Sequence, residues 1–311
     1  MRASSDVIAV FDHCTLRLRR ARAARRGGAE FLYAEAAERL ADRLDDVNRT
    51  FPAVLDLGSR TGLLGRRLAG RAGLVSLVSA DPCPVFAAQA TGARLALDPE
   101  TLPFTAGSFD AVLSVLALHW ANDLPGALIQ LRRALRPDGL LLASLFGGDT
   151  LAELRRALME AELAEEGGVS PRVSPFAEMR DLGGLLQRAG FALPVIDADR
   201  VTVTYPDAFA LMRDLRAMGE SNAVRERRRG FTRRATLARA AVRYAELFGQ
   251  ADGRIPATFE IITLTAWTPH DSQPQPLRPG SARTRLAAAL GTTERSADDQ
   301  AAPDKAGPGT R

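Results

Sequence analysis

Apolar and polar residues alternate in blocks along the chain, and each block predicts one helix or strand. A short apolar run at 53–57 leads into a glycine-bearing turn and then into a helix from Gly62 to Leu68. Further strands and one amphipathic helix are predicted at 74–81, 109–116, 124–135 and 140–146. Pro137 and Gly139 end that helix. The alternation of buried strands with helices is typical of an α/β protein with a doubly wound parallel sheet.

The second half of the chain contains more helices and two further strands. Helices are predicted at 150–163, 181–189, 207–218 and 232–248, and strands near 196–205 and 259–267. Thr150 and Glu153 have the spacing of a capping box at the start of the first of these helices. Two helices thus fall between the last two strands, and such an insertion is expected to form a cap on the substrate side. From Asp271 the composition predicts a flexible tail, disordered from Gly291.

Length and composition favour one elaborated domain. The 311 residues are 46% hydrophobic, which suits a single core of ordinary size. We expect a basic segment or helix at 1–29, a main domain at 30–270 with helical insertions at about 150–190 and 206–250, and the tail at 271–311. No apolar run is long enough for a membrane span, and Cys14 and Cys83 suit a reducing compartment. A cytoplasmic location is therefore expected.

Positive charge comes almost entirely from arginine, since Lys305 is the only lysine. Two arginine clusters stand at 17–26 and 225–234, yet no aromatic residues alternate with them as a base-stacking surface would require. We interpret both clusters as solvated helix faces, and no nucleic-acid partner is predicted.

The first strand and its turn predict a nucleotide site. Gly58 permits a tight turn with close ligand approach, and the helix that follows directs its amides toward the crevice. Asp81, at the end of the next strand, is placed to bind both hydroxyls of a ribose. The series Asp56-x-Gly58-x-Arg60-x-Gly62 begins with an acid, which favours S-adenosylmethionine over a dinucleotide. Arg60 stands where the usual motif has its middle glycine.

Residues 98–104 and 108–114 resemble the Asp-x-Glu-x-Leu-Pro-Phe and Ser-Phe-Asp segments of small-molecule S-adenosylmethionine methyltransferases. The resemblance implies that Asp98 faces the adenine amino group and that Leu102 lies near the base. Leu118-His119-Trp120 also matches that family. The predicted fold is therefore a class I methyltransferase fold. The predicted cofactor-binding residues are Asp56, Gly58, Ser59, Gly62, Asp81, Pro82, Asp98, Glu100, Leu102, Ser114 and Leu116.

More specific blocks occur at 145–155, 166–176 and 218–222, including Phe-Gly-Gly-Asp-Thr-Leu and Met-Gly-Glu-Ser-Asn. From about Val10 to Thr268 the chain resembles the fifth assembly factor of mitochondrial complex I and its bacterial relatives. The resemblance implies a methyltransferase-fold enzyme that binds S-adenosylmethionine. It also implies hydroxylation of an arginine in the quinone-site iron–sulfur subunit of complex I, as the protein substrate and partner.

Two alternatives stay open. The first is an S-adenosylmethionine-dependent methyltransferase that acts on a small molecule or on a carrier-protein-bound ester, as in biotin synthesis. The second is a non-catalytic assembly chaperone that binds the cofactor only for structure.

Two residues are candidates for catalysis. Glu220 could accept paired hydrogen bonds from a substrate guanidinium, although it could equally cap a helix or pair with Arg216. His119 stands at the end of a strand and could contact ligand. His13, His119 and His270 are too scattered to predict an iron triad, so no metal site is predicted. The sequence identifies neither the oxidant nor the catalytic base.

Overall fold

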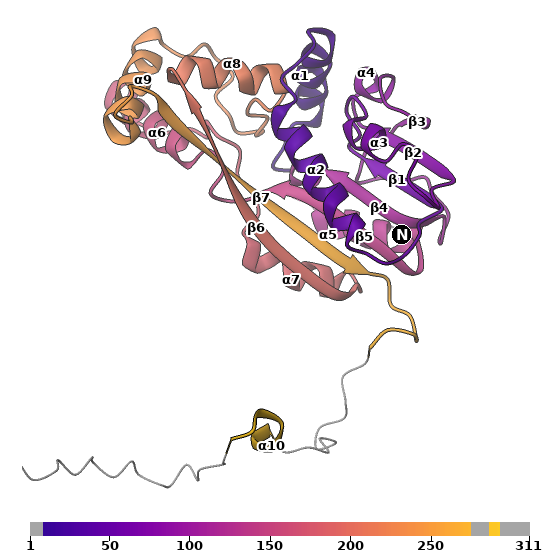
Figure 1. Ribbon diagram of the computed structural model, residues 1–311. Coiled ribbons are helices and arrows are strands. Elements are labelled where there is room, and N and C mark those ends of the chain that lie inside the picture. The colour runs from indigo at the N-terminus through magenta and orange to yellow at the C-terminus, as the bar shows by residue number, and fades with distance from the viewer. Residues whose placement is uncertain (1–8, 275–285, 293–311) are drawn as a thin grey trace, which may run out of the picture. The chain divides into compact units, whose positions relative to one another are not determined.

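A seven-stranded mixed sheet forms the centre of the protein in a computed structural model that describes residues 9–274 and 286–292 (Figure 1). The strand order is β3-β2-β1-β4-β5-β7-β6, and β7 runs antiparallel to both of its neighbours. The strands are β1 (Ala53–Leu57), β2 (Ser76–Asp81), β3 (Ala93–Ala96), β4 (Phe109–Val115), β5 (Leu135–Phe146), β6 (Ala192–Tyr205) and β7 (Ile255–Trp267). The predicted doubly wound α/β class is confirmed.

Helices cover both faces of this sheet, which explains the nearly continuous apolar strands. On one face, α2 packs through Leu40 against Val54 and Leu113. On the other face, residues of α5 and α7 pack against Leu55 and Val112. The helices are α1 (His13–Arg25), α2 (Phe31–Asp45), α3 (Leu63–Arg67), α4 (Pro84–Ala87), the 3-10 turn η1 (Leu118–Trp120), α5 (Leu124–Ala134), α6 (Ala152–Glu166), α7 (Met179–Arg188), α8 (Ala208–Met218) and α9 (Arg234–Phe248).

Helices α8 and α9 lie between β6 and β7 in the chain, as the sequence predicted. The two strands pair along their whole length, so that Tyr205 at the end of β6 faces Ile255 at the start of β7. At that end of the hairpin, α8 and α9 gather with α6 (Figure 1). The Tyr244 hydroxyl of α9 donates a hydrogen bond to the Pro256 carbonyl of β7, which fixes the insertion on the hairpin.

The N-terminal helices belong to the same compact unit as the sheet, which spans Met1–Asp271. Helix α1 packs against α4 and α8, and α2 packs against α3. A second unit, Ser272–Arg311, contains the short helix α10 (Leu286–Leu290). The tail predicted at 271–311 lies mostly outside the described residues, as does the disorder predicted after Gly291. No helix in the described parts of the chain is long and apolar enough to cross a membrane.

The predicted capping box at the start of α6 is wrong. The N-cap is Leu151, in the left-handed region with φ 56°, and it provides no side-chain cap. Glu153 instead accepts hydrogen bonds from the hydroxyl and amide of Thr258 on β7, and Thr150 bonds to the backbone of Glu260. The neighbouring strand therefore takes the side chains that the local pattern assigned to the cap.

The interpretation of the arginine clusters as solvated helix faces is also wrong in part. Residues 225–233 form a loop rather than a helix, and two of its arginines pair with Asp12 and Glu166. The first cluster does lie on α1, but Arg20 is only 1% exposed. That burial places an arginine side chain beside the predicted cofactor crevice.

Candidate functional site

The predicted cofactor residues meet where β1 lies between β2 and β4, at the carboxyl ends of these parallel strands. The chain turns to opposite sides of β1 at this point, which is where open α/β sheets bind ligands. Asp56, Asp81 and Ser114 are all 0% exposed here. The turn after β1 has positive φ at Gly58 (80°) and Gly62 (81°).

Asp81 joins two loops of the crevice. One carboxylate oxygen accepts the Arg60 amide at 3.1 Å, and the other accepts the Cys83 amide at 2.7 Å. Burial raises the pKa of Asp81, while nearby Arg20 and the two amides oppose that shift. The carboxylate therefore already orders the turn to which a ribose would bind.

Asp56 is the unsatisfied acid of the site. Neither of its carboxylate oxygens has a hydrogen-bond partner, and burial, helped by the charge of Asp81, raises its pKa to about 7. The hydroxyls of Ser59, Thr61 and Ser114 are also buried without partners. Buried polar groups are normally paired, so these free donors and acceptors near the ends of β1 and β4 fit a polar ligand.

Arg60 fills part of the crevice. Its φ of 47° is strained for a residue other than glycine. Its guanidinium carbon lies 3.7 Å from the centre of the Tyr33 ring and 4.4 Å from that of Phe86. The guanidinium donates to the Met218 carbonyl at 2.7 Å and lies 3.6 Å from the carboxylate of Glu220. Two aromatic rings and a carboxylate thus form a binding site for a guanidinium group.

Glu220 is the centre of this network. Its Oε1 accepts from Arg20 at 2.9 Å and from the Tyr33 hydroxyl at 2.5 Å. Its Oε2 accepts from the Trp120 indole at 2.6 Å, and His119 Nε2 lies 3.4 Å away. Burial would raise the pKa of Glu220, but Arg20 and the other donors hold it well below its usual range. The carboxylate is ionised and pairs with Arg20, rather than capping a helix or pairing with Arg216.

His119 lies beside this carboxylate with its side chain fully buried. Burial lowers the pKa of His119 despite the opposing effect of Glu220, so the ring is neutral near pH 7. A neutral ring donates from Nε2 to Glu220 and leaves Nδ1 as an acceptor. Nδ1 has no partner, and the ring centre lies 4.9 Å from that of Phe146 and 5.6 Å from that of Phe176. His119 therefore offers a free proton acceptor held by a carboxylate.

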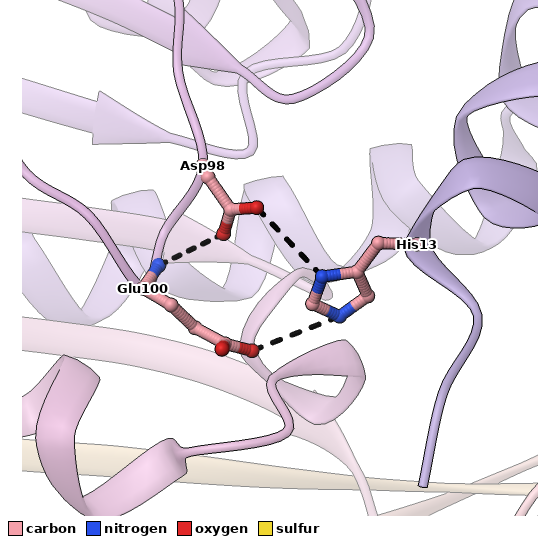
Figure 2. Close-up of side chains that lie close together, drawn as sticks. All are labelled: His13, Asp98 and Glu100. Atoms are coloured by element: carbon pink, nitrogen blue, oxygen red, sulfur yellow. Dashed lines mark hydrogen bonds and ion pairs between the residues drawn. The ribbon is translucent and has the colours of Figure 1, made fainter. Parts of the chain in front are cut away.

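His13 of α1 contacts the loop predicted to face adenine (Figure 2). Its Nδ1 lies 3.7 Å from Asp98, and its Nε2 lies 3.6 Å from Glu100 and 2.9 Å from the Trp120 carbonyl. Asp98 raises the pKa of His13. The three side chains could offer ligand atoms within 4.8 Å of one another, but the carboxylates occupy different ring nitrogens. The imidazole ring thus lies between two acids, and these contacts fasten α1 to the loop that borders the crevice.

The space left for a cofactor in this arrangement is small. Pro82, Asp98 and Glu100 line a cavity of about 30 Å³ together with His13 and Trp120. Ligand sites of cofactor size are on the order of 300 Å³ or more. The cavity is thus far smaller than a cofactor site, although the donor and acceptor groups near it suit a polar ligand.

Leu102 and Leu116 complete the predicted set. The Leu102 amide donates to Gln130, which ties the loop after β3 to α5. Leu116 has φ 46° and donates its amide to the Ser144 carbonyl, at the turn that follows β4. Both positions therefore hold the loops that border the crevice.

Sequence reasoning missed Arg20 and Tyr33. Helical spacing could have predicted that Arg20 is buried, because it lies on the same face of α1 as the buried residues Leu16, Ala23 and Ala24. A charged residue within an apolar stripe predicts a buried ion pair. No local pattern identifies its partner, Glu220, 200 residues along the chain.

Comparisons with known proteins agree with this geometry. A methyltransferase-domain family matches residues 55–143, which cover the crevice and its strands. The mitochondrial arginine hydroxylase NDUFAF5 of Danio rerio is 43% identical over 262 residues, covering 83% of this chain and 81% of that protein. The malonyl-[acyl-carrier protein] O-methyltransferase of Xylella fastidiosa (strain M23) is 39% identical over 244 residues, covering 76% and 80%.

A solved structure shares the fold. The protein BH2331 of Bacillus halodurans C-125, provisionally described as a methyltransferase, superposes with a TM-score of 0.52 at 17% identity, covering 74% of this chain and 99% of that one. Together with the matched domain, this confirms the class I methyltransferase fold predicted from the sequence.

Proposed function

This chain belongs to the family of the NDUFAF5 arginine hydroxylases, and we propose that it binds S-adenosylmethionine and hydroxylates an arginine of a protein substrate. The proposed substrate is the quinone-site iron–sulfur subunit of respiratory complex I, modified in the bacterial cytoplasm during assembly. The observation that carries the proposal is 43% identity over 262 residues, a span that includes both the crevice and the segment around Glu220.

The residues of the crevice have distinct roles in this proposal. Asp81 would bind the ribose, Asp98 the adenine, and the unpaired Asp56 would face the polar remainder of the cofactor. When bound, S-adenosylmethionine supplies a positively charged sulfonium with an electrophilic methyl group. The orphaned carboxylate oxygens of Asp56 support this assignment, since a polar ligand would satisfy them.

The site for the substrate arginine is the carboxylate and aromatic pair that now holds Arg60. Glu220 Oε1 lies 3.6 Å from the Arg60 guanidinium, and Tyr33 offers its ring face, so a substrate guanidinium could take the same position. A groove of about 190 Å³ reaches Glu220 from the surface and is lined by Phe176 and Asn222. A substrate arginine that enters this groove would replace Arg60 at Glu220.

His119 is the proposed proton acceptor. Its neutral ring has a free Nδ1, and its Nε2 is oriented by the Glu220 carboxylate. We propose that Glu220 positions both the substrate guanidinium and the His119 ring, so that its loss would affect binding and proton transfer together.

A methyltransferase activity is the second candidate. It is favoured by the match to the methyltransferase domain and by the 39% identity to the Xylella fastidiosa carrier-protein methyltransferase. The same crevice would serve both reactions, because both require the cofactor at the carboxyl ends of β1 and β4.

The mass of the substrate subunit distinguishes the candidates. The quinone-site subunit is purified from cells with and without this protein and is then digested. The masses of its arginine-containing peptides are measured by mass spectrometry. A gain of one oxygen on an arginine supports hydroxylation, and a gain of one methyl group supports the alternative. No change of mass, with normal complex I assembly restored by the protein, would mean a non-catalytic role.

A further inference from the structure

A basic cavity of about 540 Å³ lies between α1, the end of α8 and the loop that follows it. Its residues come from segments far apart in the sequence, which the fold brings together around one hollow. The arginines that line it are Arg19, Arg22, Arg26, Arg172, Arg216, Arg227 and Arg228. Among the residues that the structure describes, no acidic side chain lines the cavity.

The arginines of this cavity divide into two groups. Three have carboxylate partners outside it, since Arg172 pairs with Glu162, Arg227 with Asp12 and Arg228 with Glu166. Within residues 9–274 and 286–292, the other four form no ion pair with a carboxylate. These four unpaired arginines are Arg19, Arg22, Arg26 and Arg216.

The positive charges repel one another. Burial lowers the pKa of Arg19, and the charges of Arg227 and Arg22 lower it further. Arginines elsewhere on this protein avoid such repulsion by pairing across elements, as Arg43 does with Asp197 and Arg71 with Asp45. A concave group of like charges concentrates a positive potential, which attracts a counter-ion.

We propose that this cavity is a binding site for a compact phosphate-bearing anion. Guanidinium groups bind phosphate oxygens through paired hydrogen bonds, and a compact polyanion can contact arginines of several elements at once. An acidic peptide suits the cavity less well, because an extended chain separates its side chains by about 3.3 Å per residue along an open path. The arginines of this cavity instead surround a single hollow.

The site has a structural consequence for the rest of the protein. Ser221 and Asn222 line the cavity directly after Glu220, and Arg19 of α1 donates to both of their carbonyls. A bound anion would therefore hold α1 against the segment that carries Glu220. None of its unpaired arginines belongs to the cofactor crevice, but the cavity adjoins the proposed substrate groove, since Arg172, Arg216, Ser221 and Asn222 line both.

Calorimetric titration of the full chain with inorganic pyrophosphate, in a buffer free of phosphate and sulfate, tests the site. The test variant is the double substitution Arg22→Ala and Arg216→Ala. The matched control is Arg25→Ala with Arg213→Ala, which removes the same charge from exposed positions of the same two helices outside the cavity.

We expect one pyrophosphate per chain, bound about tenfold or more weakly by the test variant and within about twofold of the parent by the control. Absence of binding by the parent would overturn the proposal. Equal weakening in both double variants would also overturn it, since it would mean non-specific attraction to net charge.

Two further titrations identify the source of the phosphate. Vesicles of phosphatidylcholine containing phosphatidic acid, sedimented with parent and test variant, ask whether a lipid head group fills the site. If the parent sediments with the vesicles and the test variant does not, the proposal holds and the phosphate belongs to a lipid. If the parent binds pyrophosphate but does not sediment with the vesicles, the proposal holds and the anion is soluble. Tighter binding of an Asp/Glu-rich peptide than of pyrophosphate would overturn it in favour of a protein partner.

Discussion

Arg60 stacks on Tyr33, with its guanidinium carbon 3.7 Å from the ring centre. One residue belongs to the turn of the cofactor motif and the other to α2, so the contact joins the crevice to the helices that cover it. Since Arg60 also lies 3.6 Å from Glu220, the same side chain occupies the crevice and the proposed substrate site. Binding of cofactor and of substrate should therefore both require its displacement.

Replacing Arg60 with glycine should strengthen S-adenosylmethionine binding. Glycine adopts the positive φ of 47° without strain, and loss of the side chain opens the crevice. The freed space predicts roughly a tenfold gain in affinity by calorimetry. Relief of about 1 kcal/mol of backbone strain should instead raise the free energy of unfolding. Arg60→Ala serves as the control that opens the space but keeps the strain. Weaker binding by Arg60→Gly than by the parent would mean that the guanidinium holds the cofactor.

Replacing Asp81 with alanine should weaken cofactor binding and also destabilise the fold. A hydrogen bond to a charged group contributes about 1.5–3 kcal/mol, which predicts at least a tenfold loss of affinity if Asp81 binds ribose. The fold should lose stability as well, because this carboxylate accepts the amides of Arg60 and Cys83. Calorimetry and urea unfolding of the same preparation separate the two effects. Unchanged affinity with reduced stability would remove Asp81 from the ribose site.

Replacing Glu220 with glutamine should destabilise the protein by about 3–5 kcal/mol, because it leaves the buried charge of Arg20 without its partner. Loss of substrate modification in this variant is therefore interpretable only where the fold persists, as circular dichroism would establish. Glu38→Gln is the matched control, since Glu38 pairs with Arg67 at the surface. This exposed pair is screened by solvent, so we expect the control to unfold at nearly the same urea concentration as the parent. An equal loss of unfolding free energy in Glu220→Gln and Glu38→Gln would contradict a stabilising buried ion pair between Glu220 and Arg20.

Asp56 should make the protein less stable as the pH rises from about 4 to 7. Its pKa is raised from 3.8 to about 7 in the folded state, so the folded protein binds more protons than the unfolded chain over this range. Stability falls with pH wherever the folded state holds the extra proton. Urea unfolding at several pH values should show a loss of a few kcal/mol that Asp56→Asn largely abolishes. The same pH dependence in the variant would assign it to another group.

The sequence predicted those parts of the site that depend on local pattern. The turn from Gly58 to Gly62 and the acid at Asp81 follow directly from a strand, a glycine and a helix in succession, and the structure has them at one crevice. The contacts of Arg20 with Glu220 and of His13 with Asp98 join distant segments. They depend on how α1 packs, which no short pattern specifies.

Contacts with a distant strand also replaced the helix cap that the local sequence pattern predicted. Thr150 and Glu153 have the spacing of a cap, yet both bond to β7, because the strand offers partners closer than the helix terminus. The short elements β3 and α4 were not predicted at all, since four residues are too few to show a period.

Replacing Gly58 with alanine should destabilise the fold before it affects the cofactor. An added Cβ would lie 2.2 Å from the Cβ of Ala117, and the φ of 80° is unfavourable for any side chain. Gly70→Ala separates these causes, because Gly70 has nearly the same φ, 78°, with nothing within 4 Å of an added Cβ. We expect about 1 kcal/mol for Gly70→Ala and roughly 1–3 kcal/mol more for Gly58→Ala in urea unfolding. If both variants lose the same unfolding free energy and only Gly58→Ala loses cofactor binding, Ala117 must shift without cost to make room for the added Cβ. Gly58 would then be required for the ligand alone.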